Sequence, residues 1–107
     1  PVICGFNTVV PKRNSTTILN LKKVEINGGR VILNKEEFPL FVVGEYGKGR
    51  TAAFTADLAP HWSGGLTDWG KQRIPIHAPK SKEAEVGVHY VQFITNVLNW
   101  LSKNTEK

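Results

Sequence analysis

Residues 39–62 read PLFVVGEYGKGRTAAFTADLAPHW, and this stretch decides the fold. Residues 40–43 form a short, continuously apolar run, which is typical of a strand covered on both faces. The glycines within residues 46–49 allow the positive φ angles that a tight reversal needs. Residues 51–55 then return as a second strand, so the sequence predicts an antiparallel hairpin that ends just before a His-Trp pair.

A second turn signal, Asn-Gly-Gly at residues 27–29, lies upstream of this hairpin. Residues 17–26 and 30–33 flank it with β-branched and apolar side chains, which predicts another hairpin. The polar residues 34–37 are expected to link the two hairpins. With one slip in the alternation, the apolar residues of 17–26 are expected on a common side: Leu19, Leu21, Val24 and Ile26.

The last half of the chain is predicted to contain one long loop and one helix. Residues 58–87 hold three prolines and four glycines, which indicates a long irregular segment. From residue 88 the apolar positions follow helical spacing, which predicts an amphipathic helix to about residue 102. Its apolar stripe comprises Tyr90, Phe93, Ile94, Val97, Leu98 and Leu101.

Composition limits the class of protein. The chain has 107 residues, 40% hydrophobic and 21% charged, which fits an ordinary folded domain. The formal charge is +5, but the basic residues are scattered without interleaved aromatics, so no nucleic-acid partner is predicted. No apolar run approaches the roughly 20 residues that span a membrane, so no membrane partner is expected either.

The ends and the single cysteine suggest a setting. The chain begins with Pro1 and contains no methionine, so we expect a fragment of a longer protein, forming a single domain over residues 1–107. One cysteine and no visible secretory signal favour a cytoplasmic location. Cys4 itself lies in an apolar run, and a buried, unreactive thiol is expected.

Several segments, in a fixed order, resemble the glutamine amidotransferase-like family of the class I glutamine amidotransferase-like superfamily, which has trehalose-utilisation-type relatives. The resemblance spans about residues 5–102, although residues 71–87 match poorly. It rests on residues 39–50, 53–57 and 60–62, with support from Trp69, from Asn99-Trp100-Leu101 and from Gly5-Phe6-Asn7.

This resemblance implies an α/β fold. The chain is similar to the C-terminal part of a flavodoxin-like sandwich about twice its length. Within this chain, we expect antiparallel hairpins with a long C-terminal helix packed over them. The N-terminal half, which would carry the nucleophile, is then missing. The expected partner is that half or a second copy, because an uncovered sheet invites association.

His61 is the candidate catalytic residue that the resemblance supplies. In working class I amidotransferases a histidine after a late strand activates a cysteine thiolate. His61 follows residues 51–55 in a similar place, but its neighbours differ from the His-Pro-Glu order of active enzymes. An orienting carboxylate would have to come from Asp57 or Asp68 by folding of the loop. Alternatively, His61 lines a pocket or orders the loop.

The other candidate ligand-binding residues each have a structural alternative. Asp57, at a strand end, either binds a ligand or caps local N–H groups. Arg50 either grips an anion or pairs with Glu45 across the hairpin. Trp62 and Trp69 either line a pocket or anchor the loop on the core. The histidines lack metal-ligand spacing, so no metal site is predicted, and no cofactor is expected.

Three functions remain open. The first is an amidotransferase-like module that is not catalytic by itself and binds a small ligand near the 57–69 loop. The second is a hydrolase or amidotransferase that uses His61 as base, with a nucleophile from the missing N-terminal part. The third is a protein-interaction domain without a small-molecule site.

Overall fold

The computed structural model describes residues 1–58, 60–77 and 79–102. The chain divides into two compact units. The first, which we call the sheet unit, is Asn7–Thr55. The second, the helical unit, combines Pro1–Phe6 with Ala56–Lys107.

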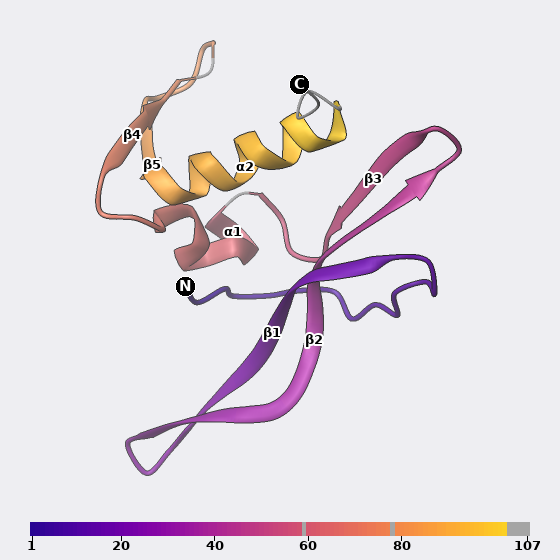
Figure 1. Ribbon diagram of the computed structural model, residues 1–107. Helices are drawn as coiled ribbons and strands as arrows, with labels where there is room; N and C mark the ends of the chain where they lie inside the picture. Colours follow the sequence, from indigo (N-terminus) through magenta and orange to yellow (C-terminus); the bar gives the residue numbers. More distant parts are fainter. Residues whose placement is uncertain (59, 78, 103–107) are drawn as a thin grey trace. The chain divides into compact units, whose positions relative to one another are not determined.

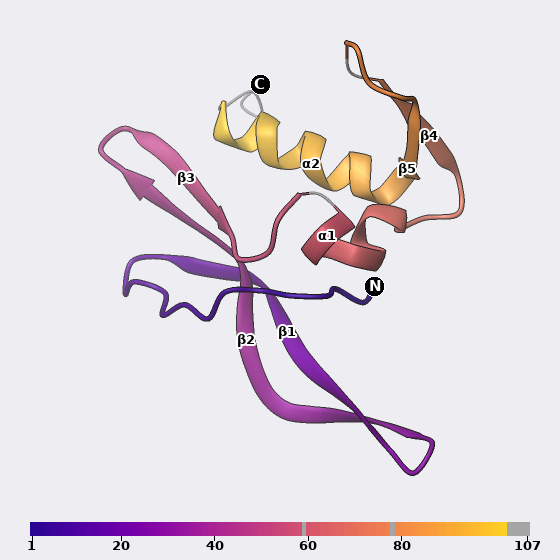
Figure 2. The ribbon, with the colours of Figure 1, turned by 180° about the vertical axis from the view of Figure 1, so that it is seen from behind.

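The sheet unit is a three-stranded antiparallel sheet, drawn in Figures 1 and 2. Its strands are β1 (Thr16–Asn27), β2 (Arg30–Tyr46) and β3 (Gly49–Phe54), in the order β1-β2-β3. Both predicted hairpins are therefore confirmed. Gly28 and Gly29 have φ angles of 58° and 79°, the two positive values of a type I′ turn.

β2 corrects one expectation, because the predicted polar link at residues 34–37 lies inside a continuous strand. The register passes from Lys22↔Glu37 to Val24↔Leu33, so three residues of β2 face the single Lys23 of β1. This bulge is closed locally, since the Glu36 N–H donates to Asn34 Oδ1 at 3.0 Å. Polar side chains are tolerated here because this part of the ribbon is exposed.

The slip that was predicted in the side-chain alternation of residues 17–26 also differs from the structure. The extra residues lie in β2, so the alternation of β1 continues and puts Val24 and Ile26 on the side opposite Leu19 and Leu21. Exposure agrees with this arrangement. Leu19 and Leu21 are half-buried, whereas Val24 and Ile26 are exposed.

The core of the sheet unit lies where all three strands pair. Leu40 and Phe41 are the buried apolar residues, although a register shift between Leu19 and Asn20 leaves Leu40 without a partner on β1. Phe41 is paired with Phe54 of β3, with ring centroids 6.5 Å apart. The predicted covering of residues 40–43 is confirmed for its first two residues.

The helical unit replaces the expected irregular segment 58–87 with short elements: α1 (Pro60–Ser63), η1 (Gly64–Asp68), β4 (Arg73–Ile76) and β5 (Ala84–Gly87). The prolines and glycines do not prevent these elements from forming, because they occupy positions where helices and strands tolerate them. Pro60 is the first residue of α1, where a missing N–H costs nothing. Pro75 lies in the two-stranded antiparallel ribbon β4–β5, where one strand edge needs no partner.

Helix α2 (Val88–Leu101) confirms the predicted amphipathic helix. Tyr90 is buried and most of the stripe is half-buried, but Leu98 is 60% exposed and does not belong to the covered face. Within its unit α2 contacts η1, β4 and β5. No helix in the described ranges 1–58, 60–77 and 79–102 is long and apolar enough to cross a membrane.

Candidate functional site

Asp57 lies in the turn between the end of β3 and the start of α1. Its Oδ1 accepts the N–H of Trp62 at 3.1 Å and that of Ser63 at 2.9 Å. Ser63 has no exposed surface, so this carboxylate oxygen satisfies a buried donor at the start of a helical segment. The capping role considered for Asp57 is confirmed.

His61 lies beside the second oxygen of the same carboxylate. His61 Nδ1 is 3.9 Å from Asp57 Oδ2, and the His61 side chain is 82% exposed. The loop therefore folds back and brings Asp57, four residues before the histidine, to the imidazole. Asp68, the other acid considered, pairs with Arg73 instead. The imidazole is thus open to solvent with one carboxylate oxygen next to it.

Trp62 anchors the first residues of the chain. Its carbonyl accepts the N–H of Cys4 at 2.6 Å and that of Gly5 at 3.2 Å. A Cβ on Gly5 would lie 3.2 Å from the Trp62 ring, so the indole packs on this glycine. Trp62 therefore holds the N-terminal segment, and the alternative that it anchors the loop on the core stays a prediction. Cys4, expected to be buried, is exposed, because its segment lies on the helical unit through backbone contacts rather than inside a strand.

Trp69 holds the start of α2. Its carbonyl accepts the N–H of His89 at 2.9 Å, and its ring meets the His89 ring edge-on with centroids 5.6 Å apart. The N–H of Val88 donates to Gln72 O at 2.9 Å. The first N–H groups of α2 are therefore bound to backbone carbonyls. Trp69 remains 41% exposed as a residue, so part of its surface faces solvent.

Arg50 belongs to the sheet unit, where β3 places it directly opposite Glu45 of β2. The cross-hairpin position considered for it is confirmed. The other four candidate residues, Asp57, His61, Trp62 and Trp69, belong to the helical unit. Within the described ranges no group of three or more His, Cys, Asp or Glu residues is placed to hold a metal ion.

A comparison with known protein families shows the family of this chain. The family model described as putative glutamine amidotransferase matches residues 1–74, which is more than half of the chain. The chain belongs to the putative glutamine amidotransferase family. The match contains Gly5-Phe6-Asn7, the β2–β3 hairpin and the Asp57 turn. It ends before α2, so Asn99-Trp100-Leu101 lies outside it. No curated protein matches the chain.

Tyr90 is a residue of this amidotransferase-like chain that sequence reasoning placed only in a helical stripe. It is 8% exposed, and its hydroxyl donates to the Leu58 carbonyl at 2.6 Å, next to Asp57. Burial, and secondarily the charge of Asp57, raise the pKa of Tyr90 above its ordinary value of 10.0. The phenol therefore holds the segment that follows Asp57. The sequence contains no signal for so distant a contact.

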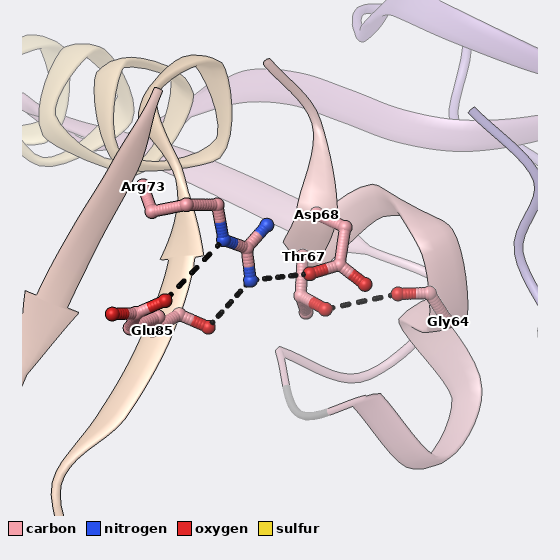
Figure 3. A network of polar contacts seen from close by, with 5 residues as sticks. All are labelled: Gly64, Thr67, Asp68, Arg73 and Glu85. Atoms are coloured by element: carbon pink, nitrogen blue, oxygen red, sulfur yellow. Dashed lines mark hydrogen bonds and ion pairs between the residues drawn. The ribbon is translucent and has the colours of Figure 1, made fainter. Parts of the chain in front are cut away.

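Arg73 was also missed, because the sequence showed it only as one of many scattered basic residues. Figure 3 shows its guanidinium between two elements. Nη2 lies 2.8 Å from Asp68 Oδ1 and donates to the Glu85 carbonyl at 3.1 Å, while Nε lies 3.8 Å from Glu85 Oε2. Arg73 thus ties the end of η1 to the β4–β5 ribbon, and the bond from Thr67 Oγ1 to Gly64 O closes η1.

Proposed function

We propose that this chain is a glutamine amidotransferase-like module that is not catalytic by itself and binds a small polar ligand beside Asp57 and His61. One observation carries the proposal. Asp57 uses Oδ1 for the backbone, which leaves Oδ2 next to an imidazole that is 82% exposed. An ordered carboxylate and an accessible imidazole together suit a ligand with ammonium, amide or hydroxyl groups.

Trp62 and Trp69 are the apolar part of the proposed site. The half-exposed Trp69 ring offers a flat surface, and Trp62 lies next to His61 in α1. Arg50 belongs to the other unit, so its part in binding stays a prediction from the sequence. The family description makes L-glutamine the natural first ligand to test.

The absence of catalysis is proposed because the only thiol is not set up as a nucleophile. Cys4 is the single cysteine of the chain and lies in an irregular segment whose N–H is held by Trp62 O. A nucleophile of this class is normally presented on a strained turn between a strand and a helix. We further propose the flavodoxin-like sandwich and the cytoplasmic location from the family resemblance and the single cysteine.

Titration with L-glutamine, followed by two-dimensional ¹H–¹⁵N NMR, tests the binding proposal. Amide signals of residues 57–69 are expected to shift, and the shifts are expected to disappear in Asp57→Asn and His61→Ala. Asp57→Asn keeps an oxygen that can accept the Trp62 and Ser63 N–H groups, so it removes charge without removing the cap. His77→Ala changes another exposed histidine and should bind like the wild type. No shift at 57–69, or equal shifts in all variants, contradicts binding beside Asp57 and His61.

A catalytic role for His61 is the second candidate, favoured by the 3.9 Å approach of Asp57 Oδ2 to its Nδ1. An acid beside an imidazole is part of the arrangement that activates a nucleophile. Release of ammonia from L-glutamine by a longer protein that includes the N-terminal part, but not by its His61→Ala variant, would establish this role in place of the first. If neither binding nor turnover is found, an interaction domain is the remaining alternative.

A further inference from the structure

The far end of the β1–β2 hairpin, which we call the distal ribbon, has only two strands. It consists of residues 22–27 and 30–33, whereas β3 pairs only with residues 41–46 of β2. In Figure 1 this part extends beyond the region where β3 joins the sheet. An isolated two-stranded ribbon is marginally stable in water. Its paired residues Val24, Leu33, Ile26 and Val31 are all exposed, from 48% to 78%.

The outer edge of β1 in this ribbon presents unpaired backbone groups. The two-residue loop pairs Asn27 with Arg30, and in such a hairpin these residues exchange hydrogen bonds. By alternation, the N–H and C=O groups of Val24 and Ile26 then point away from β2. Across the part of the chain that the structure describes, no other segment donates to or accepts from them. This edge is a template for a further strand.

The charges along the edge favour one register with an identical strand. In an antiparallel pair centred on Val24, each Val24 faces the other, and Lys23 of each copy faces Glu25 of the second copy. These Lys-Glu pairs are non-hydrogen-bonded, where side chains come closest. Centres on Lys22, Lys23 or Glu25 would instead place like charges opposite each other. Lysine on an edge normally discourages pairing, but here its opposite position carries a carboxylate.

We propose that β1 of the distal ribbon pairs edge to edge with β1 of a second copy around a twofold axis at Val24. The pairing makes a four-stranded sheet from two ribbons. It satisfies the outward backbone groups of Val24 and Ile26 and forms two Lys23–Glu25 pairs. Such an isologous contact closes on itself and stops at a dimer.

Sedimentation velocity over a concentration series, with charge-reversal variants, tests the proposal. The wild type is expected to show a reversible dimer. Lys23→Glu and Glu25→Lys each place like charges opposite each other twice and are expected to raise the dimer dissociation constant roughly tenfold. The double variant Lys23→Glu/Glu25→Lys restores unlike pairs and is expected to return the constant to near the wild-type value.

Two comparisons keep the result specific. Lys12→Glu makes the same charge change outside the ribbon and is expected to leave the dimer intact. Lys23 also lies over the Phe38 ring of its own chain, with Nζ 5.0 Å from the centroid, and both Lys23→Glu and the double variant lose this contact. Restoration therefore cannot come from it. The proposal is overturned if the wild type stays monomeric or binds only unrelated proteins. It is also overturned if the double variant dimerises no more tightly than the single variants.

Discussion

Gly47 in the sheet unit and Gly87 in the helical unit are required for opposite reasons. Gly47 has a φ of 58°, and a Cβ there would meet nothing within 4 Å. Gly87 has an ordinary φ of −74°, but a Cβ there would overlap the Trp69 carbonyl group. The sheet unit is therefore shaped by local turn conformation, and the helical unit by close packing of segments distant in sequence.

The largest effect is expected from Gly87→Ala. The added methyl meets backbone atoms of Trp69 that cannot move aside like a flexible side chain, so the free energy of unfolding should fall by about 3 kcal/mol. Gly47→Ala, the matched change, costs only the left-handed strain of about 1 kcal/mol. Urea unfolding measures both losses: tryptophan fluorescence follows the first, because all three tryptophans lie in the helical unit, and far-UV circular dichroism follows the second. Equal losses in the two variants would remove the contrast between the units.

A smaller loss is expected from Tyr90→Phe, which removes the hydroxyl that donates to Leu58 O and leaves that acceptor without its donor. The cost should be about 1–2 kcal/mol by the same urea measurement. Tyr46→Phe is the control, because Tyr46 is 84% exposed on its hairpin. A loss in Tyr90→Phe no larger than that in Tyr46→Phe would show that long-range contacts of this kind do not hold the helical unit.

The raised pKa of Tyr90 adds a pH dependence whose sign is fixed. Below pH 10.0 the phenol is protonated in both states, and its full contribution to stability is present. As the pH rises above 10.0, the unfolded chain loses this proton first, so the free energy of unfolding falls until the native pKa is passed. Absorbance titration of Tyr46→Phe, in which Tyr90 is the only tyrosine, should give a pKa above 10.0. A lower value would contradict the burial of the phenol.

The smallest effect is expected from Asp68→Asn. The Arg73–Asp68 pair is 2.8 Å long, but both side chains are substantially exposed, so its loss should cost about 0.5 kcal/mol and less in high salt. Lys22→Gln, which removes the exposed pair with Glu37, is the equivalent in the sheet unit. Unfolding at low and high salt measures both. A loss above about 2 kcal/mol would mean that Arg73 organises the helical unit more strongly than its exposure allows.

The contrast between the units explains how much of the fold could be predicted. Both hairpins followed from turn residues and neighbouring strands, and α2 from its own apolar spacing. The polar residues 34–37 predict a link between two strands, but they continue β2, because an exposed ribbon accepts polar side chains. α1 and η1 were missed because each is five residues or shorter and rests on distant partners, such as the bond from Gly65 N to Val2 O.

The candidate site was predictable to a similar degree. Asp57 is predicted from its position at a strand end and His61 from the family resemblance, and capping by Asp57 is one of the two alternatives. The N–H groups that Asp57 caps could not be predicted, because they depend on the residue at which α1 begins. Tyr90 and Arg73 act through contacts that depend on the folded position of α2 and the β4–β5 ribbon, and no local pattern specifies these contacts.

Amide hydrogen exchange at Trp62 and Ser63 tests most directly the claim that Asp57 orders its turn with one oxygen and leaves the other, with His61, at the surface. The wild type should protect both amides, and Asp57→Asn should retain most of that protection. Asp57→Ala should exchange roughly tenfold faster or more, because both donors lose their acceptor. His61 should react with diethyl pyrocarbonate in all three proteins. Wild-type exchange as fast as in an unstructured peptide, or no change in Asp57→Ala, would contradict the claim.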